Sequence, residues 1–301
     1  MKIVALFAAL LAERLFTQLF HWRELRWLDP LFDFGLRCSA RLSGVSGYAW
    51  ILLVLVLAAA PVIALRLMLG DALLGLPYFL LSVGVLFLCL GPEDIAENVD
   101  HWCQAVRSGD VEEERVHAKA LLERRFHDTT AARADVPAAV FVQANNRMFA
   151  VIFWFVVLGP VGAWVFRVAD LARRRALFQT GREHPEATVA SDCERRADDV
   201  HAWLAWIPAR LTALGYVLAG NYDAGTDAWR SITTHDLSPS AANEALLCRV
   251  GDAATPISQA DGESDVDWYV RDALASKDLV VRTLWFWVVG VAVLTLFGVL
   301  I

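Results

Sequence analysis

Two arginines beside or inside apolar stretches carry the chemistry that most needs an explanation. Arg210 lies in the apolar sequence Trp206-Ile-Pro-Ala-Arg-Leu211, and Arg167 ends an apolar run that contains Trp154. A charged group at membrane depth costs free energy and indicates a functional site, whereas an arginine near the interface extends to water without any such role. Both interpretations remain open for Arg210. A guanidinium group is well suited to phosphate or carboxylate, so the chemistry it offers is anion binding.

Other reactive groups form no familiar constellation. The sequence contains no GxxxxGK[ST], HExxH, GxSxG or SxxK motif. His101 and Cys103 lie two residues apart, a spacing that turns helical side chains to different faces, so we expect no metal site there. The five cysteines are scattered and never spaced as CxxC, which favours free thiols. No cofactor is predicted.

The elements that must position these arginines are helices in a membrane. The hydrophobic fraction is 57%, above the roughly 45–50% of soluble domains. A bilayer core requires roughly 20 apolar residues in a helix. Hydrophobic segments meet or approach that length near 1–20, 48–69, 71–91, 148–169 and 282–301, with a partial one at 203–219. The sequence predicts an all-α, polytopic membrane protein with about four to five membrane segments, forming one membrane-embedded domain over 1–301.

The first residues do not resemble a cleaved signal. Glu13 and Arg14 interrupt the apolar stretch, and large residues follow where a cleavage site requires small ones. We therefore expect an uncleaved helix over 1–20, either buried against other helices or lying partly in the interface.

Charge separates the solvated parts from the membrane. The segments 92–147, 167–202 and 220–281 hold most of the ionisable residues. Gly220–Val281 contains eleven acidic and four basic residues, an excess equal to the whole net charge of −7. No basic stripe with interleaved aromatic residues is present, so we expect no nucleic-acid partner.

Basic clusters predict the membrane topology, but one cluster, Arg173–Arg175, does not fit a simple series of complete crossings. Arginines flank the segments 48–69 and 71–91, which form a hairpin with both ends in the cytoplasm. A complete crossing by 148–169 would place Arg173–Arg175 outside. Gly159–Pro160 and Gly162 favour a broken or re-entrant segment, because proline removes a helix hydrogen bond and glycine loosens the chain. A simple kinked span is the alternative. Pro208 is interpreted as the start of a helix.

Two of these stretches together resemble a known superfamily. The FW…GP.GA…FR pattern at 153–167 followed by WIPARL at 206–211 is similar to the AmpE and CobD/CbiB membrane proteins. Glu13–Arg14 and Cys89–Leu90–Gly91–Pro92 resemble the AmpE branch. A weaker similarity, to the CobD/CbiB branch, lies at Trp229, His235, Ser238–Pro239 and Glu244.

The resemblance implies one of two functions. The AmpE branch is an inner-membrane protein linked to the regulation of β-lactamase expression and encoded with the amidase AmpD. The CobD/CbiB branch makes adenosylcobinamide phosphate by amide formation. Where the synthases carry acidic residues, this chain has Val142, Gln143, Asn145 and Asn146, and it has Arg173–Arg175 in place of a second conserved stretch.

These departures favour a regulatory inner-membrane protein of AmpE type that takes part in cell-wall sensing, and no catalytic residue is assigned. The alternative is a membrane amide synthase that uses ATP, magnesium and other acids such as Asp170, Asp198 or Asp199. A transporter is a third class, for which only one interrupted segment is found where two are expected.

The resemblance and the residue types together define the candidate residues. Ligand-binding candidates are Trp154, Arg167, Trp206, Arg210, Trp229, His235 and Ser238. Structural motif residues are Glu13, Arg14, Gly159, Pro160, Gly162, Pro208 and Pro239. The expected location is the bacterial inner membrane, in multi-pass form. The expected partners are the lipid bilayer, an anionic small molecule at the cytoplasmic face and, functionally, the AmpD pathway, with a homo-oligomer left open.

Overall fold

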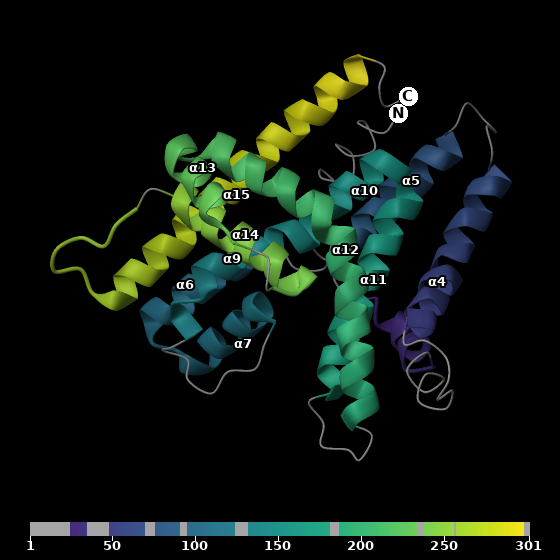
Figure 1. Ribbon diagram of the computed structural model, residues 1–301, viewed down its shortest axis with the longest axis horizontal. Helices are drawn as coiled ribbons and strands as arrows, with labels where there is room; N and C mark the ends of the chain where they lie inside the picture. The colour runs from purple at the N-terminus through teal and green to yellow at the C-terminus, as the bar shows by residue number, and fades with distance from the viewer. Residues whose placement is uncertain are drawn as a thin grey trace. The chain divides into compact units, whose positions relative to one another are not determined.

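The described residues fold into helices joined by turns, and no strand occurs among them, which confirms the predicted all-α fold (Figure 1). The computed structural model describes residues 25–34, 48–69, 76–90, 95–123, 132–180, 187–233, 237–255 and 257–297. These residues divide into two compact units. The first takes its residues from Met1–Pro92, Ala150–Ala205 and Leu294–Ile301, and the second from Glu93–Phe149 and Trp206–Val293.

The first unit is built around helix α11. Its helices are α4 (Tyr48–Leu69), α5 (Leu76–Cys89), α10 (Ala150–Leu158), α11 (Pro160–Thr180) and the first part of α12 (Ala187–Ala219), after a short 3₁₀ helix η2 (Arg26–Leu28). Helix α11 packs against α4, α5 and α10 (Figure 1). Trp164 Nε1 of α11 donates to the carbonyl of Ala58 in α4 over 2.8 Å. Ala58 lies three residues before Pro61, a proline inside α4.

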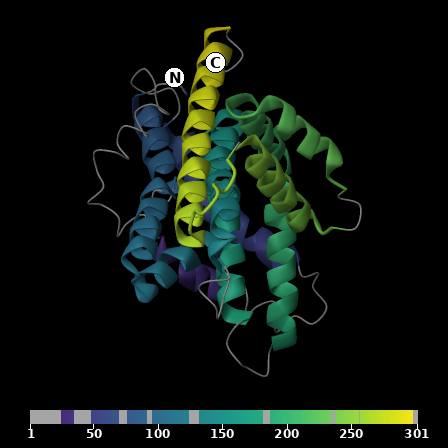
Figure 2. The same cartoon turned by 90° about the vertical axis from the view of Figure 1, so that its left-hand side faces the viewer.

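The second unit has a dense aromatic core. Its helices are α6 (Ile95–Ser108), α7 (Val111–Leu122), α9 (Val136–Ala144), the π-helix η4 (Asn145–Phe149), the end of α12, α13 (Tyr222–Ser231), α14 (Pro239–Ala254) and most of α15 (Asp265–Leu296). The buried rings of Phe141 and Phe149 pack on that of Tyr216, whose hydroxyl donates to the Phe141 carbonyl over 2.9 Å. Helix α15 is the long yellow helix of Figure 2.

Within the part of the chain that the structure describes, four helical stretches are long and apolar enough to cross a membrane. They are Tyr48–Met68, Val136–Leu158, Glu194–Ala219 and Asp265–Thr295, with Leu76–Cys89 as a shorter apolar helix. Much of their apolar surface is exposed in the protein, for example at Leu52, Val56 and Ile63 on α4. Contiguous apolar surface of this kind is unfavourable in water and suits contact with lipid tails. The chain is therefore a helical membrane protein.

The predicted break at Gly159–Pro160 is present. Gly159 adopts a φ of +71°, in the left-handed region that favours glycine, and α11 begins at Pro160. A Cβ added to Gly162 would lie 2.5 Å from the carbonyl oxygen of Trp154, so the chain folds back closely on itself here. The long apolar stretch thus ends at Leu158 and begins as early as Val136.

Other helix boundaries also differ from the sequence-based ones. Helix α12 begins at Ala187 and α15 at Asp265, both well before the hydrophobic segments at 203–219 and 282–301. The interpretation of Pro208 as a helix start was wrong, because Pro208 lies inside α12. Proline has no N–H to donate to the carbonyl of residue 204. Trp154 Nε1 donates to that Leu204 carbonyl instead, over 3.1 Å, and the helix continues.

Candidate functional site

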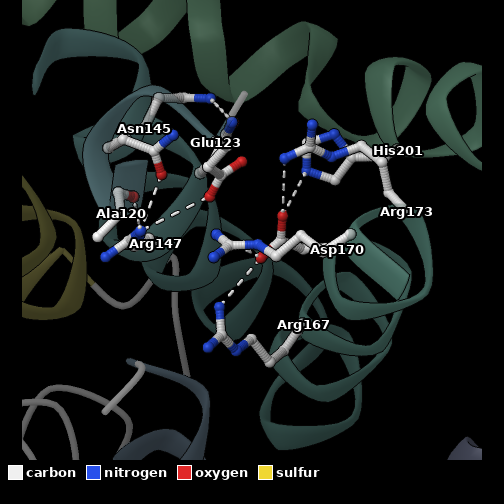
Figure 3. A network of polar contacts seen from close by, with 11 residues as sticks. Ala120, Glu123, Asn145, Arg147, Arg167, Asp170, Arg173 and His201 are labelled. Atoms are coloured by element: carbon white, nitrogen blue, oxygen red, sulfur yellow. Dashed lines mark hydrogen bonds and ion pairs between the residues drawn. The ribbon is translucent and has the colours of Figure 1, made fainter. Parts of the chain in front are cut away.

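The first candidate site is a buried carboxylate surrounded by cations in the first unit. Asp170 is fully buried and pairs with three arginines of its own helix: Arg167 at 3.0 Å, Arg173 at 3.3 Å and Arg174 at 3.0 Å. The spacings of three and four residues bring these side chains to one helix face. His201 of α12 places Nε2 3.7 Å from the same carboxylate. Figure 3 shows Arg167, Arg173 and His201 converging on Asp170.

Electrostatics keep Asp170 ionised. Burial by itself would raise its pKa, but Arg174, Arg173 and Arg167 outweigh burial and hold the pKa of the carboxyl well below its usual range. The carboxylate joins three guanidinium groups and one imidazole from two helices. We call this group of five residues the Asp170 cluster. Arg167, a predicted ligand-binding residue, is thereby engaged in an ion pair within α11, and His201 is the contact that α12 makes with the same carboxylate.

The second candidate site centres on Arg210 in the second unit. Its guanidinium lies 3.9 Å from the ring centroid of Trp206, one turn earlier on α12. Its Nη1 donates to the Trp206 carbonyl over 2.8 Å and to Oδ1 of the buried Asn243 on α14 over 3.1 Å. The cation is therefore held between a ring of its own helix and an amide of a neighbouring helix.

A hollow opens beside this guanidinium. It has a volume of about 130 Å³ and is lined by Arg210 of α12, by Trp229 of α13 and the nearby Ile232, and by Ala242 and Leu246 of α14. We call it the Arg210 pocket. Two of the predicted ligand-binding residues, Arg210 and Trp229, line it together, and a third, Trp206, supports the guanidinium. Sequence reasoning did not find Asn243, Ile232, Ala242 or Leu246, because only the packing of three helices brings them together.

The remaining predicted residues have other positions. Ser238 caps α14, its hydroxyl accepting from the Ala241 N–H over 3.3 Å, and Pro239 follows at the first helical position. Ser238 therefore positions the helix that carries Asn243. Trp154 lies in the first unit on the Leu204 carbonyl. His235, Glu13 and Arg14 fall outside the described residues.

Sequence reasoning also missed a buried polar layer at the π-helix. Asn145 accepts from the Thr212 hydroxyl over 3.1 Å and donates to the Asn146 side chain over 3.1 Å. Arg147 donates to Gln143 over 3.0 Å and to the Ala120 carbonyl over 2.6 Å, and it lies 3.6 Å from Glu123 (Figure 3). The signal was a run of polar residues inside an apolar stretch, and single-turn π-helices often occur at functional sites.

The described residues offer no cluster of metal ligands. No group of three or more His, Cys, Asp or Glu side chains is close enough to hold a metal ion in the part of the chain that the structure describes. Asp170 has its oxygens directed to arginines, and Asp199 accepts a hydrogen bond from the Tyr48 hydroxyl over 3.1 Å. These two acids are thus already used within the fold.

The fold defines a polytopic helical membrane protein whose second unit carries a hollow beside Arg210. A family model described as "Regulatory signalling modulator protein AmpE" matches residues 1–301, and the chain belongs to the AmpE family.

The chain is also similar to two proteins named cobalamin biosynthesis protein CobD. The one from Chromobacterium violaceum is 29% identical over 165 residues, which cover 54% of this chain and 50% of that protein. The one from Stutzerimonas stutzeri is 27% identical over 211 residues, which cover 67% of this chain and 66% of that protein. The matches thus span half to about two thirds of these relatives. No solved structure matches the chain.

Proposed function

We propose that this protein is a regulatory signalling protein of the bacterial inner membrane that acts in β-lactamase induction and responds to the state of the cell wall. The observation that carries the proposal is the family match over residues 1–301. Its input is an anionic small molecule reaching the cytoplasmic face, and its functional link is to the AmpD amidase pathway. The lipid bilayer is its constant partner.

The geometry of the two arginine sites supports a ligand-responsive regulator more than an enzyme. The Asp170 cluster is buried and internally paired, as expected of a rigid structural element. The Arg210 pocket is open and carries a positive charge beside an indole ring. A site with a positive charge, an apolar wall and no described nucleophile or metal ligand is suited to binding without chemistry.

The experiment is complementation in a strain that lacks this gene. β-Lactamase activity is measured before and after exposure to a sub-inhibitory β-lactam, with the wild type or the Arg167→Ala/Arg210→Ala double variant expressed at equal membrane levels. We expect the wild type to restore the normal response and the double variant to fail. An unchanged response in the double variant would remove the support that the arginines lend to the proposal.

A second function is favoured by the similarity to the two CobD proteins. In that case the chain would be an amide synthase of the adenosylcobinamide-phosphate type, using ATP and magnesium. Asp170 is poorly suited to hold magnesium, because three guanidinium groups already neutralise it. Expression in a strain lacking the cobinamide synthase tests this function. Cobalamin-dependent growth would favour the synthase, and no growth from well-expressed protein would count against it.

A further inference from the structure

The Arg210 guanidinium is held in place, and one of its two-nitrogen edges has no hydrogen bond to any described residue. Among the described residues, both of its hydrogen bonds come from Nη1, to the Trp206 carbonyl and to Asn243 Oδ1. Stacking on the Trp206 ring fixes the plane of the group. The Nε and Nη2 hydrogens form the edge that matches two oxygens of a phosphate or carboxylate. A guanidinium oriented in this way loses little conformational freedom when it binds an oxyanion.

The walls of the pocket are apolar on the sides away from the guanidinium. Of the five described residues that line it, only Arg210 carries a charge. Trp229 and Ile232 pack against the core of the second unit, and Leu246 belongs to that core. A bare inorganic anion would leave these walls without a partner. A ligand with a ring or an alkyl group beside its anionic head would make van der Waals contact with these residues as well as with the guanidinium.

The size and setting of the pocket are consistent with a small amphiphilic ligand. The hollow itself has a volume of about 130 Å³, below the roughly 300–1,000 Å³ of sites for drug-sized ligands, so it suits a phosphate group that carries no more than one ring or a short chain. Helix α12 also exposes an apolar face at Trp203, Ile207 and Leu211, with Leu214 and Leu218 continuing it. This face suits contact with lipid tails, so the pocket borders a helix that is itself expected to lie in the bilayer.

We propose that the Arg210 pocket binds an amphiphilic phosphate, its oxyanion on the Nε–Nη2 edge of Arg210 and its apolar body against Trp229 and Leu246. The inference deepens the proposed function by giving the ligand class, and rests on it only in taking the ligand as a signal. Two sources share this chemistry. One is a soluble phosphate ester with a ring or short chain, and the other is the head group of an anionic phospholipid.

Binding to the purified full-length protein in a neutral detergent tests the site. Titration calorimetry is carried out with phenyl phosphate, inorganic phosphate and benzyl alcohol. We expect phenyl phosphate to bind at least about tenfold more tightly than either of the other two. Only phenyl phosphate has both an oxyanion for the Arg210 guanidinium and a ring for the apolar lining residues. Equal affinity for phenyl phosphate and inorganic phosphate, or no binding of phenyl phosphate, would overturn the proposal.

Variants locate the binding. Arg210→Gln is expected to weaken phenyl phosphate binding by at least about tenfold. Ala242→Phe is expected to abolish it by filling the hollow while Arg210 remains, so the site stays testable if the first variant fails to fold. Arg249→Gln is the matched control, because this exposed arginine lies on the same α14 helix outside the lining. Unchanged binding in both pocket variants would overturn the assignment.

Nanodiscs separate the two sources. If phosphatidylglycerol nanodiscs abolish phenyl phosphate binding that phosphatidylcholine nanodiscs retain, the pocket takes a lipid head group. If both retain it, the pocket takes a soluble ester.

β-Lactamase induction is measured in parallel with phenyl phosphate binding. Absent binding with induction that still depends on this gene would overturn the pocket and leave the regulatory function intact. Normal binding of phenyl phosphate with no effect of the gene on induction would overturn the regulatory function and leave the pocket assignment intact.

Discussion

Arg167 and Arg210 occupy similar places in the sequence and very different places in the molecule. Each lies in or at the end of an apolar stretch. Arg167 is buried and paired with Asp170, which Arg173, Arg174 and His201 also contact. Arg210 has no carboxylate partner among the described ion pairs, stacks on Trp206 and reaches a hollow. The first arginine is part of the scaffold, whereas the second lines a hollow.

The difference follows from the neighbours that each helix supplies. Helix α11 places an acid three residues after Arg167, at the spacing at which helical side chains meet. Helix α12 places Trp206 four residues before Arg210, which orients the charge without neutralising it. A buried cation requires a counter-charge or a polar neighbour. The first unit therefore provides its own anion, and the second unit leaves room for one.

Removing the central acid should have the largest effect. Asp170→Asn leaves three arginines around a neutral amide, and breaking a buried ion pair costs about 3–5 kcal/mol. Thermal unfolding in detergent micelles measures the loss. The matched control is Asp227→Asn, whose partner Arg230 forms an exposed pair on α13, where about 0–1 kcal/mol is expected. Equal losses in the two variants would contradict a structural role for the Asp170 cluster.

Asp170→Asn should also change how the stability of the protein depends on pH. Burial opposes ionisation of Asp170, but its arginines hold the folded-state pKa well below the ordinary value. The stabilisation is therefore present above the unfolded-state value near 3.9 and is lost as the pH falls through the folded-state pKa. We expect the stability difference between wild type and Asp170→Asn to be constant from about pH 7 to 5 and to shrink below about pH 4.

Replacing Arg167 and Arg210 by glutamine, one at a time, distinguishes the arginine that stabilises the fold from the arginine that binds the ligand. Arg167→Gln should cost about 2–3 kcal/mol, less than the loss of the acid, because two other arginines still neutralise Asp170. Arg210→Gln should change the unfolding temperature little and weaken phenyl phosphate binding. Each variant is measured by both thermal unfolding and calorimetry. The comparison would fail if Arg167→Gln impaired binding as strongly as Arg210→Gln while remaining fully folded.

The tryptophan at the proline break gives a smaller effect. Trp154→Phe removes the donor to the Leu204 carbonyl and should cost about 1–2 kcal/mol. Pro208→Ala restores the helical N–H that this carbonyl normally accepts, so the cost of Trp154→Phe should fall in the Pro208→Ala background. A double-mutant cycle measures the coupling. Additive effects would show that Trp154 contributes packing alone and that the hydrogen bond is unimportant.

The smallest effect is expected at the cap of α14. Ser238→Ala removes the acceptor for the Ala241 N–H and should cost about 1 kcal/mol. Because α14 carries Asn243 and two lining residues of the Arg210 pocket, binding should weaken less than in Arg210→Gln. Ser238→Asp, which keeps a capping oxygen, is expected to retain wild-type stability. A loss of stability in Ser238→Asp equal to that in Ser238→Ala would argue against the cap.

Much of the fold could be predicted from local patterns. Long apolar runs require helices, because a helix satisfies its own backbone hydrogen bonds in lipid, and Gly159–Pro160 had to interrupt one of them. Pro208 was misjudged, because a proline inside a helix depends on a donor from elsewhere in the chain. That donor, Trp154, is 50 residues from Leu204 in sequence, and no local pattern indicates the contact.

The sequence by itself determined the helical membrane class, the family resemblance and the two arginines worth testing, since composition, period and motif are properties of neighbouring residues. Only the tertiary structure decided which arginine is paired and which faces a pocket. Asn243, Trp229 and Leu246 meet Arg210 because α12, α13 and α14 pack together. Burial and electrostatic pairing depend on distances in space, which residue spacing fixes within one helix but not between helices.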